Sequence, residues 1–281
     1  MNYQWYPGHM TKAVRAMKEQ LKLIDLVIEI IDARIPVSSR NPDLNEMAKG
    51  KYRLVVLNKS DLADPGKTAA VKKKLNDEGC IVLETDARNK ASVKNVKNAT
   101  LSACAEKIER DRKRGIVGRP IRAMVVGIPN VGKSTFINSI VGRSSAKTGN
   151  KPGVTKGNQW ISTGAGLELL DTPGILWPKF EDQTVGRNIA LIGSMNDEIT
   201  EPAELALELA DILKTSYPDL LKERYFKGEE DVSQMAPAEI MNSIAVSRGC
   251  IVAGGETDIV KASRLFIDDF RSGRLGRISL E

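Results

Sequence analysis

Residues 121–134 read IRAMVVGIPNVGKS and decide the fold class of this chain. The apolar run 121–126 predicts a buried strand, the next eight residues fit the phosphate-loop pattern GxxxxGK[ST], and a helix-compatible run begins near Lys133. In such a loop, backbone N–H groups and the helix N-terminus bind phosphate oxygens, Lys133 bridges the β- and γ-phosphates, and Ser134 binds Mg²⁺. We therefore expect a nucleoside triphosphate to contact Asn130, Val131, Gly132, Lys133, Ser134 and Thr135.

A second phosphate-contacting segment is predicted at Asp171-Thr172-Pro173-Gly174, 37 residues beyond Ser134 and directly after an apolar strand pattern. Asp171 is expected to hold Mg²⁺ through water, and the Gly174 amide to meet the γ-phosphate, which places Gly174 with Lys133 among the catalytic residues. Between the two motifs, Thr155 lies in a polar loop and is expected to contact the nucleotide and add a hydroxyl ligand to Mg²⁺. An ordinary loop threonine is the alternative.

The sequence Asn58-Lys59-Ser60-Asp61 follows the strand pattern 52–57 and predicts a loop that reads the base. Asp61 accepts from guanine N1–H and the 2-amino group, whereas adenine offers neither donor, so GTP is favoured over ATP. Lys59 is expected along the base plane, and Asn58 to tie this loop to the phosphate loop; a simple strand-to-helix turn is the alternative. GTPases usually carry a serine–alanine pair beside guanine O6, and a loose match to it follows the next strand, at Thr85, Asp86 and Ala87.

Short apolar runs alternate with helix-compatible stretches, at 26–32, 52–57, 81–84 and 121–126. This alternation predicts a mostly parallel sheet covered by helices, with a long helix over 92–114. Strand patterns at 157–162 and 167–171 predict an antiparallel hairpin. Beyond about residue 180, few strand patterns remain, and amphipathic helices are predicted at 202–214, 237–248 and 258–272.

The order of the motifs is unusual, because the base-reading loop precedes the phosphate loop, whereas ordinary small GTPases have it last. A circular permutation explains this order. When the original chain ends lie close together, they can be joined and the chain can begin elsewhere, and the same sheet and site still form. The predicted fold is therefore α/β: a circularly permuted P-loop GTPase domain with a mostly parallel sheet at 1–178, followed by a smaller, all-helical C-terminal domain at 179–281. A switch-like loop is expected near 144–156.

Composition points to a soluble globular protein, with 41% hydrophobic and 28% charged residues in 281. The longest apolar stretches are interrupted by acids such as Glu29, so no membrane span is predicted, and the N-terminus lacks the features of a signal peptide. Three widely spaced cysteines without a CxxC pattern give no zinc site. We expect a cytoplasmic protein without a membrane partner.

The net charge of +6 permits a polyanionic partner without requiring one. Bases outnumber acids between Glu106 and Arg122, which indicates either a contact with RNA phosphates or simply a solvated helix end. Four arginines near the C-terminus add to the case for RNA, at Arg264, Arg271, Arg274 and Arg277. Aromatic residues make up only 5% of the chain, so phosphate contact and shape recognition are favoured over base stacking.

The permuted order and the phosphate loop GIPNVGKS resemble the ribosome biogenesis GTPase A family, as do residues 5–10 (WYPGHM) and 32–42 (DARIPVSSRNP). The similarity runs over nearly the whole chain. It implies a cytosolic bacterial GTPase that binds the late precursor of the large ribosomal subunit and is stimulated by it. It also implies that the helical C-terminal domain contacts ribosomal RNA. A monomer without a DNA partner is the accompanying expectation.

Hydrolysis needs a group that positions the attacking water, and Ile175 stands where Ras-type enzymes have a glutamine. His9, the only histidine in the chain, lies in a Pro-Gly loop ahead of the first predicted helix. A lone histidine is more often structural, but the resemblance implies that His9 is catalytic. Asn130 matches the asparagine with which potassium-stimulated GTPases hold K⁺; a loop residue tolerant of left-handed backbone is the alternative. Arg34 and Arg40 are further candidates, for phosphate or RNA.

Two other functions remain open at this point. One is a GTP-gated RNA-binding module in which hydrolysis is incidental and the nucleotide only sets affinity. The other, an ATPase or nucleotide kinase, is disfavoured by Asp61 and by the lack of a recognisable domain for an acceptor substrate.

Overall fold

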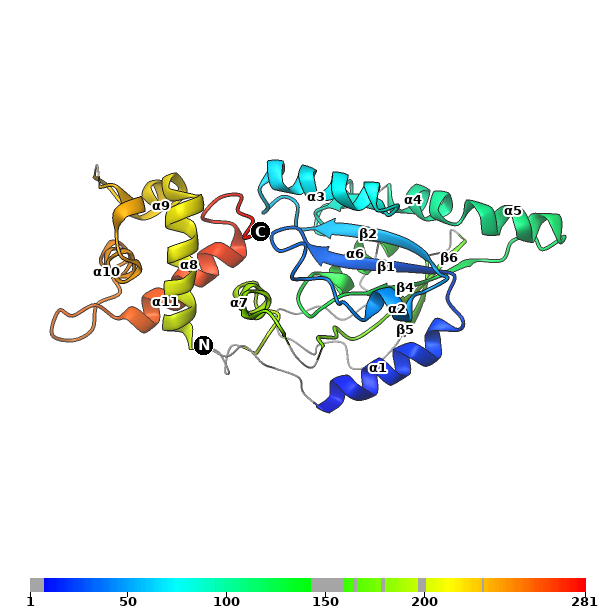
Figure 1. Ribbon diagram of the computed structural model, residues 1–281, viewed down its shortest axis with the longest axis horizontal. Coiled ribbons are helices and arrows are strands. Elements are labelled where there is room, and N and C mark those ends of the chain that lie inside the picture. Colours follow the sequence, from blue (N-terminus) through cyan, green and yellow to red (C-terminus); the bar gives the residue numbers. More distant parts are fainter. Residues whose placement is uncertain are drawn as a thin grey trace.

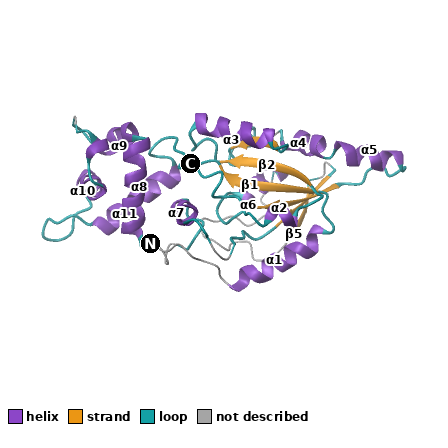
Figure 2. Cartoon of the chain, in the orientation of Figure 1, coloured by secondary structure: helices purple, strands orange, loops and turns teal. Residues whose placement is uncertain are grey.

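The structure of the protein, a computed structural model, describes residues 8–93, 95–142, 159–163, 166–177, 180–196, 201–228 and 230–281, without the side chains of residues 8, 9 and 13. The strands lie together in one half of the molecule, and a cluster of helices forms the other half (Figure 1 and Figure 2). Within the described ranges, no helix has the length and apolar character needed to span a membrane.

A six-stranded sheet in the order β3-β2-β1-β4-β6-β5 forms the first half; β5 is antiparallel to β6, and the other neighbours are parallel. The strands are β1 (Leu26–Asp32), β2 (Tyr52–Asn58), β3 (Ile81–Thr85), β4 (Ile121–Val126), β5 (Gln159–Ser162) and β6 (Leu167–Asp171). The predicted strands and hairpin are confirmed. The register pairs Asp32 with Asn58 and Asn58 with Thr85, so these strand ends lie side by side at the carboxyl edge.

Helices cover both faces of the sheet, which explains why every residue of β1 is buried. Ile28 and Ile30 of β1 pack on the face that α4 and α6 cover, whereas Val27 and Ile31 pack on the face of α1, α2 and α3. The covering helices are α1 (Gly8–Leu21), α2 (Leu44–Met47), α3 (Pro65–Asp77), α4 (Val96–Ala103) and α6 (Lys133–Val141).

The single long helix predicted over 92–114 is wrong, because the chain forms two helices, α4 and α5 (Ala105–Lys113), that meet at Cys104. Figure 1 shows the reason: α4 lies against the sheet, while α5 extends past its edge. Leu101 of α4 and Ile108 of α5 are each 39% exposed, so neither apolar side chain lies in the core. Lys107 is buried instead, where it pairs with Asp111 at 2.7 Å.

The second half contains the three amphipathic helices predicted there, and α8 lies at its centre, in contact with α10 and α11. The sequence patterns missed α7 and α9. The elements are α7 (Gln183–Leu191), α8 (Pro202–Ser216), α9 (Pro218–Tyr225), the 3₁₀ helix η1 (Val232–Gln234), α10 (Pro237–Ser247) and α11 (Ile259–Ser272). After α11 the chain returns to the sheet: Ile278 donates its N–H to the Leu62 carbonyl (3.0 Å), and Leu280 to that of Arg34 (2.8 Å).

Candidate nucleotide-binding site

The described parts of the motifs meet at the carboxyl edge of the sheet. β1, β2, β3, β4 and β6 are parallel, so the loops that follow them emerge on the same side. The phosphate loop follows β4, the loop from Asn58 to Asp61 follows β2, and Asp171 ends β6. This edge faces α7 and the C-terminal helices in Figure 1.

The phosphate loop has the tight backbone that its glycines allow. Gly132 has a φ of 98°, and a Cβ there would collide with the side-chain nitrogen of Asn58. Lys133 begins α6 and folds back over the loop, donating to the carbonyls of Ile128 (2.8 Å) and Gly127 (3.1 Å). Burial lowers the pKa of Lys133 to about 8, although the nearby carboxylate of Asp171 acts to raise it.

The Asn58 side chain joins three loops. Its Nδ2 donates to the Val131 carbonyl at 2.7 Å, and its Oδ1 accepts from the Ala87 N–H (3.0 Å) and the Thr85 hydroxyl (3.2 Å). Asn58 is buried, so these bonds are shielded from water. The predicted tie between the base-reading loop and the phosphate loop is therefore present, and it extends to the loop after β3.

Lys59 makes a second tie, which the sequence patterns did not anticipate. Its Nζ donates to the carbonyl of Asn130 at 2.7 Å and lies 2.9 Å from Asp32 Oδ2. Asp32 is fully buried; burial acts to raise its pKa, but Arg34 and Lys59 hold that pKa well below its usual range. Lys59 thus joins the strand end of β1 to the phosphate loop.

Asp171 and Ser134 form the edge of the site that suits a metal ion. The Ser134 hydroxyl donates to Asp171 Oδ2 at 3.4 Å, while the buried Asp171 Oδ1 has no hydrogen-bond partner among the described residues. Burial raises the pKa of Asp171, opposed by Lys133 and Ser134. A carboxylate and a hydroxyl are hard oxygen donors, and Mg²⁺ is commonly held by one or two such groups plus substrate phosphates. These residues fit Mg²⁺.

Gly174 lies directly against the phosphate loop. A Cβ at this position would stand 2.7 Å from both N and Cα of Pro129 and 3.0 Å from Lys133 Nζ. The next residue, Ile175, donates its N–H to the Gly127 carbonyl at 3.3 Å and buries its side chain beside the sheet. The segment after β6 therefore has room for a bare backbone amide next to Lys133, as the DxxG pattern predicts.

Asp61 has one carboxylate oxygen engaged and one without a partner. Its Oδ2 accepts from Arg88 at 2.6 Å, whereas Oδ1 is buried and has no hydrogen-bond partner within the described ranges. A carboxylate in this state fits a ligand with N–H donors, as guanine has. Arg88 also bonds Asp86, and no motif had singled it out.

Asn130 makes a contact that sequence reasoning missed, because it depends on α7. Its Nδ2 donates to the carbonyl of Gly193, in the turn after α7, and the Ser194 hydroxyl donates to the Pro129 carbonyl at 2.5 Å. Asn130 has a φ of 60°, as the left-handed alternative anticipated. Arg271 of α11 donates in turn to the carbonyl of Ala190 at 2.8 Å. The phosphate loop, α7 and α11 are thus connected.

The remaining predicted site residues have the following places. The side chain of Val131 is buried, so only its backbone is available to a nucleotide. Thr135 is half-buried in the first turn of α6. The backbone of His9 lies in the first turn of α1, which corrects the loop expected there, and its side chain lies outside the described part. Thr155 and the whole of the expected switch-like loop, 144–156, lie outside the described residues.

Arg34 and Arg40 are not free for phosphate or RNA. Arg34 is buried, donates to both Asp32 oxygens (2.9 and 2.8 Å) and reaches the carbonyl of Arg271 at 3.1 Å. Arg40 pairs with the buried Glu29 at 3.4 Å. Both arginines therefore compensate buried carboxylates inside the fold.

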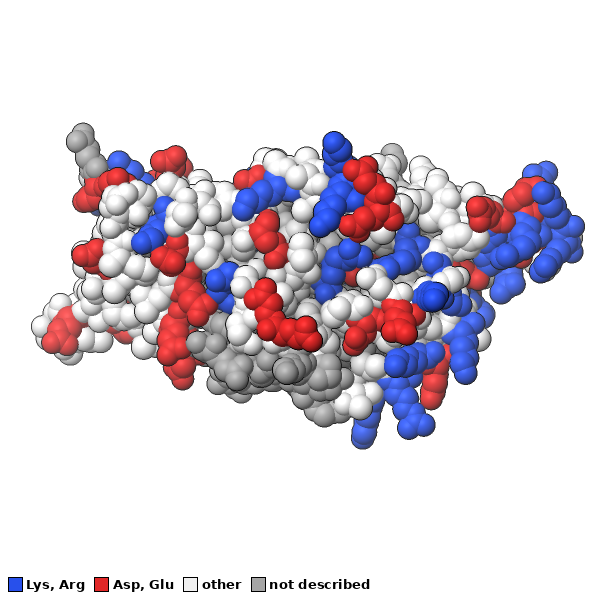
Figure 3. All heavy atoms as spheres, in the orientation of Figure 1, with Lys and Arg blue, Asp and Glu red and all other residues white. Residues whose placement is uncertain are grey.

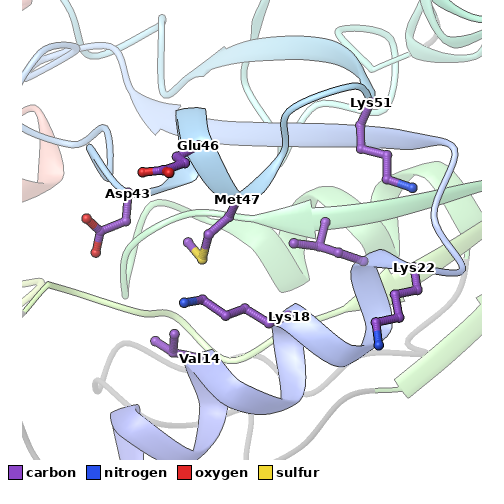
Figure 4. Close-up of a pocket in the computed structure, with 8 residues that line it drawn as sticks. Val14, Lys18, Lys22, Asp43, Glu46, Met47 and Lys51 are labelled. Atoms are coloured by element: carbon purple, nitrogen blue, oxygen red, sulfur yellow. The ribbon is translucent and has the colours of Figure 1, made fainter.

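An open cavity of about 710 Å³ lies between α1 and α2, apart from these motifs (Figure 4). Lys18 of α1 and Lys22 directly after it line one side, Asp43 and Glu46 lie on the opposite side, and Met47 points in between. None of its lining residues belongs to the phosphate loop or to the loop from Asn58 to Asp61. The cavity is therefore separate from the candidate site.

The comparisons with known proteins agree with this geometry. A family model described as "50S ribosome-binding GTPase" matches residues 122–242. Ribosome biogenesis GTPase A of Bacillus cereus is 44% identical over 100% of this chain and 94% of its own length. The protein of the same name from Thermotoga maritima is 32% identical over 99% of this chain and 93% of its own.

Solved structures give the same result for the fold. The GNP-bound structure of YlqF from T. maritima has a TM-score of 0.65 and 26% identity, covering 96% of this chain and 97% of that one. The GDP-bound structure of YlqF has a TM-score of 0.66 and 25% identity, covering 94% and 97%. Because the identity to named relatives extends along the full chain and the motifs converge at one edge of the sheet, this chain is a GTPase that belongs to the ribosome biogenesis GTPase A family.

Proposed function

We propose that this protein binds and hydrolyses GTP as an assembly factor in late maturation of the large ribosomal subunit, and that the ribosomal particle stimulates hydrolysis. The proposal is supported above all by the hydrogen bonds that Asn58 and Lys59 donate to the phosphate loop. The phosphate loop in turn contacts Gly193 and Ser194 after α7. A nucleotide bound there would contact a phosphate loop that is itself held by the turn after α7. The names of the relatives supply the ribosomal context.

In this proposal each predicted residue has a role. Asp61 reads guanine, the aliphatic stem of Lys59 lies along the base plane, and Asn58 ties the base loop to the phosphate loop. The loop at Thr85, Asp86 and Ala87 borders the base. Residues 130–135 and Gly174 bind the phosphates, with Lys133 offsetting charge on the β- and γ-phosphates. Ser134, Asp171 and Thr155 would hold Mg²⁺, and Asn130 would hold K⁺. Bound Mg²⁺ would neutralise charge on the phosphates.

His9 is proposed to position the attacking water, because Ile175 is buried and has no group for that task. His9→Ala should bind GTP normally and lose particle-stimulated turnover; full stimulated turnover in this variant would remove His9 from the mechanism.

Equal hydrolysis rates in potassium and sodium buffers would likewise remove K⁺ from the site proposed at Asn130.

The RNA contact is proposed for the end of the molecule formed by α5 and α1. Figure 3 shows lysines and arginines gathered over both helices, away from α8 and α11. Exposed bases in and after α5 are Arg110, Arg112, Lys113, Arg114 and Arg119, and those in and directly after α1 are Lys12, Arg15, Lys18 and Lys22. Such a cluster suits the phosphates of folded RNA. A cytoplasmic monomer that acts without DNA or membrane completes the proposal.

The C-terminal arginines are weaker candidates for RNA than their sequence suggested, because three of them make internal contacts. Arg271 bonds the end of α7, Arg274 pairs with Asp268 and Asp269, and Arg277 donates to the Ala63 carbonyl at 2.8 Å. Arg264 is exposed. RNA contact by the C-terminal helices, which the family resemblance implies, would therefore depend on Arg264 or on side chains other than these three arginines.

The test is single-turnover GTP hydrolysis in potassium buffer, with and without isolated large ribosomal subunits. Stimulation by the subunit is the expected result. GTP-dependent binding to the subunit without stimulation would favour a gated RNA-binding module, and the absence of both would overturn the proposal. A charge-reversed α5, Arg112→Glu with Arg114→Glu, should weaken subunit binding and leave hydrolysis without subunits unchanged.

A further inference from the structure

The loop after β3 departs from the usual serine–alanine pair by placing an acid, Asp86, before Ala87. Ala87 keeps the expected place, since its N–H donates to Asn58 Oδ1 at 3.0 Å. Asp86 brings a second carboxylate close to the loop of Asp61, and both carboxylates are partly shielded, at 24% and 31% exposed. A second negative charge here repels both the Asp61 carboxylate and a polyanionic nucleotide.

Arg88 bridges the two acids. Its Nη2 lies 2.6 Å from Asp61 Oδ2, and its Nε lies 3.3 Å from Asp86 Oδ1. The same Asp86 oxygen accepts the Arg88 backbone N–H at 2.9 Å, which anchors the start of the side chain. A planar guanidinium suits this task, because it donates to two acceptors at once in a fixed geometry.

The bridge from Arg88 sets the orientation of the Asp61 carboxylate. Oδ2 is held by Arg88, while Oδ1 is buried and has no hydrogen-bond partner among the described residues. An Asp61 carboxylate so held cannot rotate freely, and Oδ2 keeps a further lone pair for a second donor. A guanine base approaching this carboxylate therefore meets an acceptor whose orientation is already fixed.

We propose that Arg88 is a positioning residue for guanine recognition, which fixes the Asp61 carboxylate and offsets the charge that Asp86 adds. This inference rests on the proposed role of Asp61 as the residue that reads the base. It explains how the chain accommodates an acid where a serine is usual: the acid and the arginine work as a pair. Replacing both together should therefore cost less than replacing Arg88 alone.

The test measures Mg²⁺-dependent affinity for GDP and for inosine diphosphate, which lacks the 2-amino group, by titration calorimetry on the full chain. Arg88→Ala should weaken GDP binding about tenfold and reduce the preference for GDP over inosine diphosphate. Arg88→Ala with Asp86→Ser should recover most of the affinity. In an Asp61→Ala background, Arg88→Ala should cost less GDP affinity than it does in the unaltered protein, because only the charge of Asp86 is then left for Arg88 to offset.

Several outcomes would overturn the inference. GDP affinity that is unchanged or tighter in Arg88→Ala would mean that Arg88 is idle or merely blocks the base. If Arg88→Ala loses GDP affinity and Asp86→Ser does not restore it, Arg88 does not act by offsetting Asp86. If the loss leaves the preference for GDP over inosine diphosphate unchanged, Arg88 does not position Asp61. Failure of the unaltered protein to bind GDP would instead overturn the proposed function. The midpoint of thermal unfolding without nucleotide checks that each variant is folded.

Discussion

Lys59 donates from its Nζ to the backbone carbonyl of Asn130 at 2.7 Å, although 71 positions separate the two residues in the chain. The same nitrogen lies 2.9 Å from the buried Asp32 carboxylate, which fixes its position. In a permuted chain these loops come from distant segments, so such ties set their relative position. The base-reading loop and the phosphate loop are thereby held together by contacts within the protein.

Lys59→Met should weaken GDP binding about tenfold, because it removes this tie and leaves Asp32 with Arg34 as its remaining cation. Titration calorimetry with GDP measures the change. Lys72→Met is the matched control, since Lys72 pairs with Glu84 on the surface at 40% exposed and lies outside the site. Equal affinities of the two variants would show that the tie does not contribute to binding.

Arg34→Met should lower the free energy of unfolding by about 3 kcal/mol or more, because it leaves the fully buried Asp32 with Lys59 alone and removes the bonds to α11. Urea unfolding without nucleotide measures it. Arg40→Met serves as the control, with an expected loss of about 1 kcal/mol. Arg40 is 22% exposed, and its partner Glu29 keeps Arg53 at 2.7 Å. Similar losses of unfolding free energy in both variants would show that Arg34 is not a special partner of the buried Asp32.

Patterns within one segment predicted most of the fold. The apolar runs fixed the strands, and GIPNVGKS located the phosphate loop, because both depend on local periodicity and on backbone space. Arg34 could not be placed in this way, since its partners include carbonyls at the end of α11, 237 positions away. The contact of Asn130 with Gly193 likewise depends on packing between segments. The boundary between domains at 178 and 179 stays a prediction.

Gly174→Ala should reduce single-turnover GTP hydrolysis at least about a hundredfold. The Cβ added at residue 174 would stand 2.7 Å from the Pro129 backbone, so this segment must move away from the phosphate loop. The amide of residue 174 then moves away from the place expected for the γ-phosphate. Affinity for a non-hydrolysable GTP analogue should fall more than affinity for GDP. Gly66→Ala, in the first turn of α3, is the control and should hydrolyse GTP normally. Normal hydrolysis by Gly174→Ala would contradict the role of Gly174.

Nucleotide affinity should fall as the pH rises through about 8, because Lys133 in the free protein has its pKa lowered to about 8 by burial. The phosphates of a bound nucleotide favour the ammonium form and raise that pKa, so binding above pH 8 takes up a proton. Titration of GDP between about pH 7 and 8.5 should show this slope, within the range where the guanine N1 proton is retained. Lys133→Ala should bind weakly with little slope. An affinity that is constant over this range in the unaltered protein would show that Lys133 stays charged throughout.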